Sequence, residues 1–191
     1  MEALMTILAA FGLSASAGLN AYIPLFIIGV VAHYFPQAFT LNPPYDWIAN
    51  PWFLIALGVL IIIEFLADKI PAINHINDLI QTFIRPAAGA IAFAASAKVV
   101  TDVHPLLALI CGLLIAGGVH TVKAAAVRPA VTATTGGAGN VPVSIAEDVT
   151  ATIVSILSVL LPALGTILVL LALFLMLWWW TERRPRKNRA R

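Results

Sequence analysis

Long apolar segments interrupted by glycine and proline dominate the amino-acid sequence. The first extends from about Leu4 to Tyr34 and contains Gly18-Leu19-Asn20 and Pro24, so we expect a tilt, a kink or a partly unwound middle. Later apolar segments cover residues 52–65, 86–100, 105–127 and 151–180. Since a helix of about 20 apolar residues crosses a bilayer, the pattern predicts an all-α integral membrane protein, a polytopic bundle of about 5–6 membrane segments, some broken or re-entrant.

The composition supports this fold class. Apolar residues make up 61% of the 191 residues, charged residues make up 10%, and the mean hydropathy is +0.96. A soluble domain carries about 25% charged residues, so this chain has too few to cover a water-exposed surface. Seven of its 20 charged residues lie within 182–191. We expect a basic cytoplasmic tail there, behind a single membrane domain at 1–181 with possible halves 1–100 and 101–181.

The positions of lysine and arginine predict the orientation in the membrane. Positively charged residues favour the cytoplasmic side. This rule places the tail inside and the loop 35–51, which has no lysine or arginine, outside. The N-terminus is then expected inside, opposite that loop. Residues 71–85 have the spacing of an amphipathic helix on the inner side, and Pro86 is expected to begin the next span. We expect a multi-pass protein of a bacterial inner membrane.

Local motifs predict the connection before the last apolar segment. Residues 132–140 combine threonine, glycine and asparagine without a helical pattern, and we expect a loop there. Ser144-Ile145-Ala146-Glu147 matches the capping box that opens a helix. For the tail to be cytoplasmic, residues 147–180 must cross twice, with a break near Pro162, or form a re-entrant hairpin.

The two halves of the chain share a weak pattern. Gly18-Leu19-Asn20 matches Gly118-Val119-His120, and Pro86-Ala87-Ala88-Gly89 matches Pro162-Ala163-Leu164-Gly165. The same order of segments in both halves predicts an inverted 3+3 repeat, the plan of many small transporters. The alternative is chance similarity between segments rich in glycine, alanine and leucine.

Ionisable residues at membrane depth are rare and often functional, and they fall into two groups here. The first group comprises Glu64, Asp68, His75, Asp78 and Arg85. It is consistent with a cation or proton site, or with a divalent-metal site, although His75 and Asp78 three residues apart form a weak ligand pattern. The alternative is a solvated interface in which the acids pair with Lys69 and Arg85.

The second group surrounds the predicted threonine- and glycine-rich loop. It comprises His120, Lys123, Arg128, Thr132, Thr134, Thr135, Asn140, Glu147 and Asp148. Backbone N–H groups of such a loop can bind an anion beside a lysine or arginine, and threonine oxygens can coordinate a cation. The loop lacks the Gly-Lys-Ser/Thr ending of a nucleotide-binding P-loop. The alternative is a plain helix connection in which Lys123 and Arg128 pair with Glu147 and Asp148.

The sequence offers no catalytic constellation. No serine lies in a Gly-x-Ser-x-Gly pattern, and Cys111, the one cysteine, has no base near it in the sequence. We assign no catalytic residue, no metal ligand and no cofactor. The basic tail is interpreted as an anchor on anionic lipid, and no nucleic-acid site is expected.

Four motifs carry a family resemblance. They are Gly18-Leu19-Asn20-Ala21-Tyr22-Ile23-Pro24, Glu64-Phe65-Leu66-Ala67-Asp68-Lys69-Ile70-Pro71, Thr82-Phe83-Ile84-Arg85-Pro86-Ala87-Ala88-Gly89 and Arg128-Pro129-Ala130-Val131-Thr132-Ala133-Thr134-Thr135-Gly136-Gly137. Together they resemble a family of small bacterial membrane proteins named domain of unknown function 4126. The resemblance implies an integral membrane domain over nearly the whole chain apart from the tail, and it carries no catalytic assignment.

The leading hypothesis is a small transporter or channel for an ion or a small polar solute. Its pathway would be lined by Asn20 and the two charged groups. We expect a homo-oligomer surrounded by membrane lipids, because one copy of this short chain has few helices with which to surround a pathway. The alternatives are a non-transporting membrane scaffold or partner subunit, and a membrane-embedded lipid-modifying enzyme. The decisive question is whether the two charged groups meet.

Overall fold

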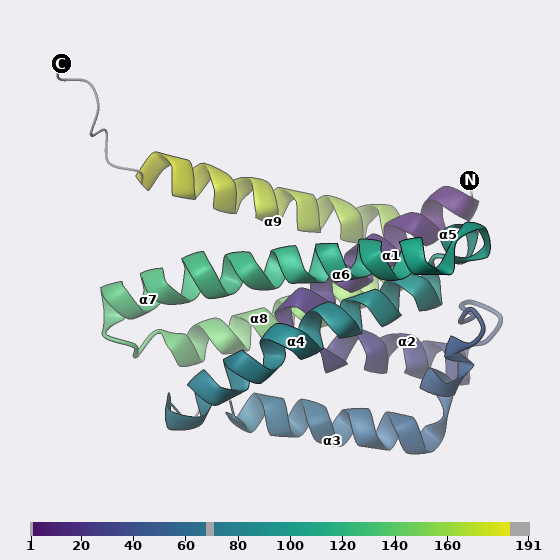
Figure 1. Cartoon of the computed structure of the whole chain (residues 1–191), viewed down its shortest axis with the longest axis horizontal. Helices are drawn as coiled ribbons and strands as arrows, with labels where there is room; N and C mark the ends of the chain where they lie inside the picture. The colour runs from purple at the N-terminus through teal and green to yellow at the C-terminus, as the bar shows by residue number, and fades with distance from the viewer. Residues whose placement is uncertain (1, 68–70, 184–191) are drawn as a thin grey trace.

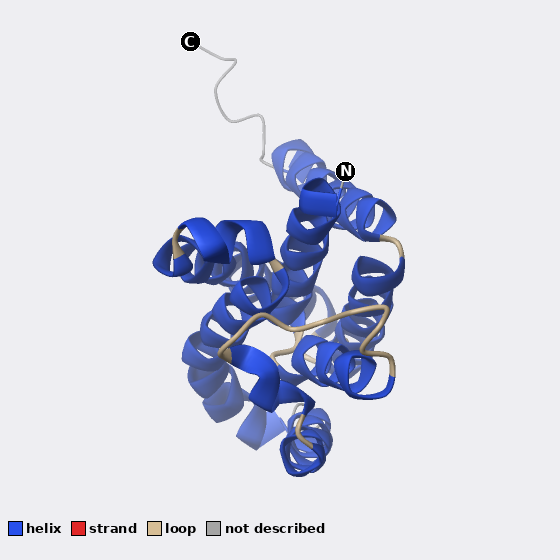
Figure 2. Ribbon diagram, turned by 90° about the vertical axis from the view of Figure 1, so that its right-hand side faces the viewer, coloured by secondary structure: helices blue, strands red, loops and turns tan. Residues whose placement is uncertain are grey.

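The computed structural model describes residues 2–67 and 71–183, and helices form nearly all of this part of the chain (Figures 1 and 2). They are α1 (Glu2–Leu19), α2 (Tyr22–Tyr34), α3 (Pro51–Ala67), α4 (Pro71–Ser96), α5 (Lys98–Val103), α6 (Pro105–Val122), α7 (Arg128–Thr135), α8 (Asn140–Leu160) and α9 (Pro162–Arg183). Two short turns accompany them: the 3₁₀ turn η1 (Tyr45–Ala49) and the π-helical turn η2 (Lys123–Val127).

Prolines decide where several helices begin. The first residues of α3, α4, α6 and α9 are Pro51, Pro71, Pro105 and Pro162. Proline suits this position because its ring fixes a helical φ and its missing N–H would have no partner in the helix anyway. The predicted break near Pro162 is confirmed, because α8 ends at Leu160 and α9 begins two residues later.

Three local predictions are wrong. Pro86 lies inside the continuous helix α4, whose following residues pack closely against α6, so it does not begin a new span. Residues 132–135 are helical because α7 starts at Arg128 with Pro129 in its first turn. The reversal to α8 needs only residues 136–139, with Gly136 and Gly137 at positive φ. Helix α8 begins at Asn140, so Ser144 does not cap it.

The first apolar segment is a hairpin and not a single span. Helix α1 runs antiparallel to α8, because Ser16 Oγ lies 2.7 Å from Ser155 Oγ while the Asn20 amide bonds Asp148 nearer the start of α8. Helix α2 then returns along α3, with Phe26 beside Gly58 and Gly29 beside Leu54. The tip of this hairpin, residues 19–21, lies inside the bundle, since Asn20 and Ala21 are at most 1% exposed.

This hairpin corrects the predicted position of the N-terminus. Ala10 of α1 shares a hydrophobic cluster with Tyr45, from the segment between α2 and α3. The start of α1 therefore lies at the same end of the bundle as residues 35–50 and α5, which we call the N-terminal end (Figure 1). The turn at 136–139 and the end of α9 lie at the opposite, C-terminal end. The N-terminus and the loop 35–51 are thus not on opposite sides.

Close backbone packing holds the centre together. Helix α1 contacts α4, α6, α8 and α9, which surround it. A Cβ atom on Gly18 would lie 2.5 Å from the Ala116 carbonyl oxygen, and one on Gly112 would clash with the Gly89 carbonyl oxygen. Glycine at these points lets helix backbones touch, which is the usual way that helices associate in lipid.

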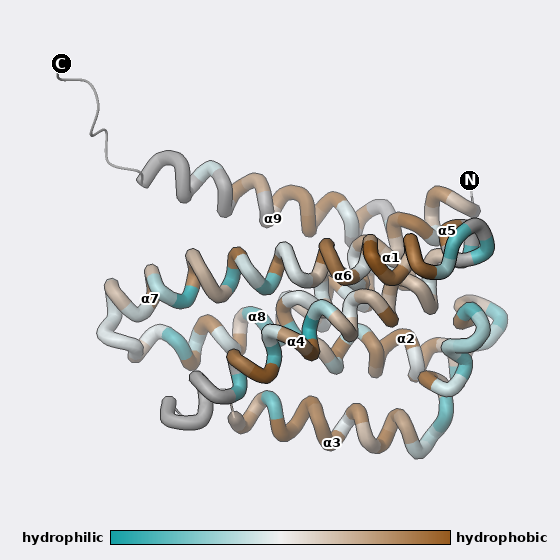
Figure 3. Tube along the Cα trace, viewed as in Figure 1, coloured by the Kyte–Doolittle hydropathy of each residue, from teal (hydrophilic) through white to brown (hydrophobic). Residues whose placement is uncertain are grey.

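The outer surface of the bundle is apolar. Three helical segments among the described residues are long and apolar enough to cross a membrane: Leu79–Ser96, Pro105–Thr135 and Asn140–Leu160. Large apolar side chains such as Ile62 of α3, Leu114 of α6 and Phe174 of α9 are exposed. Hydrophilic positions gather along residues 35–50 and α5 (Figure 3). Apolar helices with apolar outer faces indicate insertion into a membrane.

Candidate functional site

The hairpin tip places two helix ends deep inside the protein. Pro24 explains the interruption, because it has no N–H for the Asn20 carbonyl and its ring would clash with that carbonyl in a continuous helix. The new helix is capped by the Asn20 side chain, whose Oδ1 accepts from the backbone N–H groups of Tyr22 and Ile23, each at 3.1 Å. On the other side of the tip, the carbonyl oxygen of Leu19 accepts from Lys123 Nζ at 3.2 Å.

Charges at the tip complement the two helix dipoles. The ammonium group of Lys123 lies at the C-terminus of α1, which carries partial negative charge. The carboxylate of Asp148 lies near the N-terminus of α2, because Asn20 Nδ2 donates to its Oδ1 at 3.0 Å. Side chains from η2 and α8 therefore stabilise the break between α1 and α2. In apolar surroundings alone, the backbone groups at these two helix ends would have no hydrogen-bond partners.

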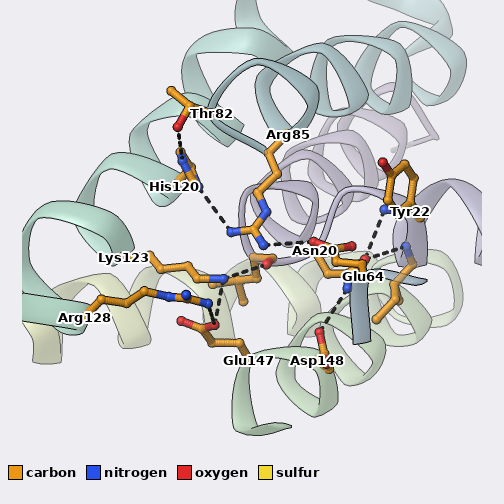
Figure 4. A network of polar contacts seen from close by, with 12 residues as sticks. Asn20, Tyr22, Glu64, Thr82, Arg85, His120, Lys123, Arg128, Glu147 and Asp148 are labelled. Carbon is orange, nitrogen blue, oxygen red and sulfur yellow. Dashed lines mark hydrogen bonds and ion pairs between the residues drawn. The ribbon is translucent and has the colours of Figure 1, made fainter. Parts of the chain in front are cut away.

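A second set of polar side chains joins α3, α4 and α6. Arg85 Nη2 donates to Glu64 Oε1 at 2.9 Å, and both side chains are at most 2% exposed. Arg85 Nη1 lies 3.2 Å from His120 Nδ1, and His120 Nε2 lies 3.2 Å from the Thr82 hydroxyl. Glu64, Arg85, His120 and Thr82 thus form one chain of contacts that leads from the buried Glu64–Arg85 pair to the exposed Thr82 (Figure 4).

The third set is centred on Glu147. Its Oε2 atom lies 2.7 Å from Lys123 Nζ and 3.5 Å from Arg128 Nη2. In an α-helix, residues five apart lie about 140° apart around the axis. The π-helical turn η2, in which the Arg128 N–H bonds the Lys123 carbonyl, brings these two cations to the same side. Pro129 favours this turn because it cannot donate to the Ala125 carbonyl.

These contacts form the tip network, which consists of Asn20, Glu64, Thr82, Arg85, His120, Lys123, Arg128, Glu147 and Asp148 (Figure 4). Its members come from the hairpin tip and from α3, α4, α6, η2, α7 and α8. Burying ions costs several kcal/mol each before pairing, and paired ions often stabilise a fold no better than apolar residues. A network of this size is therefore a functional candidate as well as a structural brace.

A pocket of about 520 Å³ adjoins the network between α1, η2, α8 and α9. Lys123, Glu147, Ser16 and Thr150 line part of it, and the remaining wall is aliphatic. The Lys123–Glu147 pair thus belongs both to the tip network and to the pocket wall.

One protein family, described as a domain of unknown function (DUF4126), matches residues 7–182. The chain belongs to this family. The match extends from α1 to the end of α9, so this DUF4126 domain contains the hairpin, the tip network and the pocket. No curated protein and no solved structure matches the chain.

The structure places most predicted site residues of this DUF4126 protein in one network. Arg85 of the first predicted group contacts His120 of the second, and Asn20 contacts Asp148, although the sequence had suggested separate groups. Asp68 lies outside the described residues. His75 and Asp78 lie on α4, and their side chains are outside what the structure describes.

The threonine-rich segment is not part of the network. Thr132 pairs with Asn140 at 3.1 Å, Thr134 donates to the Ala130 carbonyl and Thr135 to the Val131 carbonyl. These side chains stabilise the end of α7 and its turn. Among the described residues, no three His, Cys, Asp or Glu side chains lie close enough together to hold a metal ion.

Sequence reasoning missed two parts of the network. Thr82 precedes Arg85 by three residues and therefore shares its helix face, a signal that was available. The Leu19 carbonyl is a backbone group, and only the break before Pro24 indicates that it needs a partner.

Proposed function

We propose that this DUF4126 protein is a small membrane transporter for an ion or small polar solute, with its binding site at the tip network. The observation that carries the proposal is the contact of Lys123 with both the Leu19 carbonyl, at 3.2 Å, and Glu147, at 2.7 Å. The Lys123 ammonium group thus links an interrupted helix, a partly buried acid and a pocket. Transporters commonly bind their substrates where interrupted helices expose dipole ends and backbone atoms.

The position of the pocket favours a transporter over an open channel. The pocket reaches the network between α1, η2, α8 and α9, and the side chains that meet there, Lys123, Glu147 and Arg128, are buried or partly buried and contact one another directly. A solute entering from the pocket would have to displace part of the Lys123–Glu147–Arg128 set to go further. Passage coupled to rearrangement of bound groups is the behaviour of an alternating-access transporter.

Orientation and assembly complete the proposal. The C-terminal end of the bundle faces the cytoplasm of a bacterial inner membrane, because α9 ends there at Arg183 and the sequence continues with the basic residues of the tail. The N-terminal end then faces outward. Copies of the chain associate through their exposed apolar helices, as a homo-oligomer in contact with lipid. The inverted 3+3 repeat stays a prediction on which the site does not depend.

Flux measurements test the proposal. Purified protein is reconstituted in liposomes, and currents on a solid-supported membrane are recorded with sodium, potassium, chloride, phosphate and carboxylates of increasing chain length. We expect flux of at least one solute, and an about tenfold or greater reduction in Glu147→Gln and Lys123→Met, because each removes a charge-assisted contact.

Thr134→Ala is the matched control, since Thr134 is exposed and bonds only within α7 among the described contacts. It should transport like the wild type. Circular dichroism and size-exclusion profiles show that each variant is folded. Flux no greater than in protein-free liposomes, or equal flux in all variants, would contradict the proposal and favour a scaffold subunit.

A further inference from the structure

The pocket beside the tip network has the size of a ligand site. Its volume is about 520 Å³, and binding sites for small molecules have volumes of about 300–1,000 Å³. Four elements wall it in: α1, the α6–η2 segment, α8 and α9. The pocket is a partly open groove between helices, and several of its lining residues, such as Ile153 and Leu171, are exposed.

The pocket wall has two chemically different parts. Its charged residues are Lys123 and Glu147, which contact each other. Along α8 and α9 the wall consists of aliphatic side chains that include Ile153, Leu168 and Leu171. A polar group at one place and a long apolar wall elsewhere match a molecule with a polar head and an aliphatic tail.

The donors of Lys123 indicate the charge of the head. An ammonium group has three N–H donors. Among the described residues, the Leu19 carbonyl and Glu147 Oε2 take two of them. The same Glu147 oxygen also lies 3.5 Å from Arg128 Nη2, so two cations share one acceptor atom. An anionic oxygen in the pocket would accept the third donor of Lys123.

We propose that the pocket binds a single-chain anionic amphiphile, with its carboxylate or phosphate at Lys123 and its aliphatic tail between α8 and α9. The inference rests on the proposed function, because it names the class of solute that the transporter carries. A two-chain lipid has twice the aliphatic volume for one head, and the pocket volume of about 520 Å³ favours the single chain.

Photolabelling in a neutral bilayer tests the proposal directly. The protein is placed in phosphatidylcholine nanodiscs with dodecanoic acid that carries a diazirine near the end of its tail, and labelled peptides are identified by mass spectrometry. We expect labels on the stretch of α9 from Leu168 to Leu175, in which Leu168, Val169, Leu171, Ala172 and Leu175 line the pocket. Unlabelled dodecanoate and dodecyl phosphate should compete about tenfold better than dodecanol or dodecylamine, because an ionic hydrogen bond distinguishes them.

Two pairs of variants locate the site. Ala172 lines the pocket and Leu170 is an exposed residue outside its wall, so Ala172→Trp should reduce labelling several-fold while Leu170→Trp leaves it unchanged. Lys123→Met should remove the preference for anionic competitors, whereas Lys123→Arg should retain it. The tryptophan pair keeps the test decisive if Lys123→Met does not fold.

Each contrary result overturns the inference. Equal competition by dodecanol shows an unspecific apolar groove, and preferred competition by dodecylamine shows a site of the opposite charge. Equal competition by phosphatidylglycerol identifies a two-chain lipid as the occupant. Flux measurements separate this inference from the proposed function: ion flux without labelling refutes the amphiphile alone, and specific labelling without any flux refutes transport.

Discussion

The hairpin tip at residues 19–21 and the π-helical turn η2 interrupt neighbouring helices in different ways. Each comes shortly before a proline, Pro24 or Pro129, that cannot donate to the carbonyl four residues earlier. At the tip the helix ends and the chain turns back along α3. At η2 the helix continues, because the Arg128 N–H reaches the Lys123 carbonyl one residue further back.

The difference lies in which atoms each interruption provides. The tip leaves backbone groups without helical partners, and Asn20 and Lys123 satisfy them. The π turn keeps its backbone bonded but moves two cations to one side of the helix, where both contact Glu147. The tip therefore has backbone groups that need polar partners in an apolar medium. The π turn positions Lys123, which is one of those partners.

Removing the side chain that links the two interruptions should have the largest effect. Lys123→Ala leaves the Leu19 carbonyl without its described donor and removes one partner of Glu147, and breaking a buried ion pair in this way costs about 3–5 kcal/mol. Unfolding by increasing SDS in mixed micelles measures the loss. Lys98→Ala, at an exposed residue of α5, is the control and should change the free energy of unfolding little. Equal effects of the two variants would show that the tip needs no cation.

The matched glycines of the two halves should respond in opposite directions. Gly18→Ala brings a Cβ within 2.5 Å of the Ala116 carbonyl oxygen and 2.7 Å of Val119 Cβ, so we expect a loss of about 1–3 kcal/mol from overpacking. Gly118→Ala meets no atom within 4 Å and should be neutral or stabilise α6 by up to about 1 kcal/mol. The same unfolding assay measures both. Similar losses in both variants would mean that the two regions pack alike.

A smaller effect is expected at the cap of α2. Asn20→Ala removes the acceptor for the Tyr22 and Ile23 N–H groups and the donor to Asp148, which should cost about 1–2 kcal/mol. Asn20→Asp keeps the cap but places a second carboxylate beside Asp148. Adding Asp148→Asn to Asn20→Asp should recover stability, because the pair then has one charge again. A double-mutant cycle without coupling would show that the Asn20–Asp148 contact contributes nothing.

The sequence predicts which residues form the site better than it predicts which of them contact each other. Glu64, Arg85, His120, Lys123 and Glu147 stand out because so few ionisable residues lie in apolar segments. The resemblance in four motifs correctly identifies the family. The meeting of Arg85 with His120, 35 residues later, depends on how α4 and α6 pack, and the spacing of residues along one helix contains no information about that packing.

The hairpin was the main feature that sequence reasoning missed. Residues 4–34 are long enough to cross a membrane with a kink, and the lysine and arginine rule places only loops, not the depth at which a chain turns back. Asn20 and Pro24 do mark a helix end, but a kink and a reversal use the same residues. The contacts of Phe26 with Gly58 and of Ser16 with Ser155 decide between them, and these are tertiary contacts.

The glycine contacts between α4 and α6 fix three helices of the protein against one another. Gly89 and Gly112 bring the two backbones into contact, and Ser14 of α1 donates to the Gly89 carbonyl at 2.9 Å, so these three helices resist sliding past one another. Helix α9 is anchored near its start, where the Thr166 hydroxyl donates to the Leu8 carbonyl. These three helices therefore form a closely packed frame, and α9, which contributes one wall of the pocket, packs against that frame through α1 and against α8.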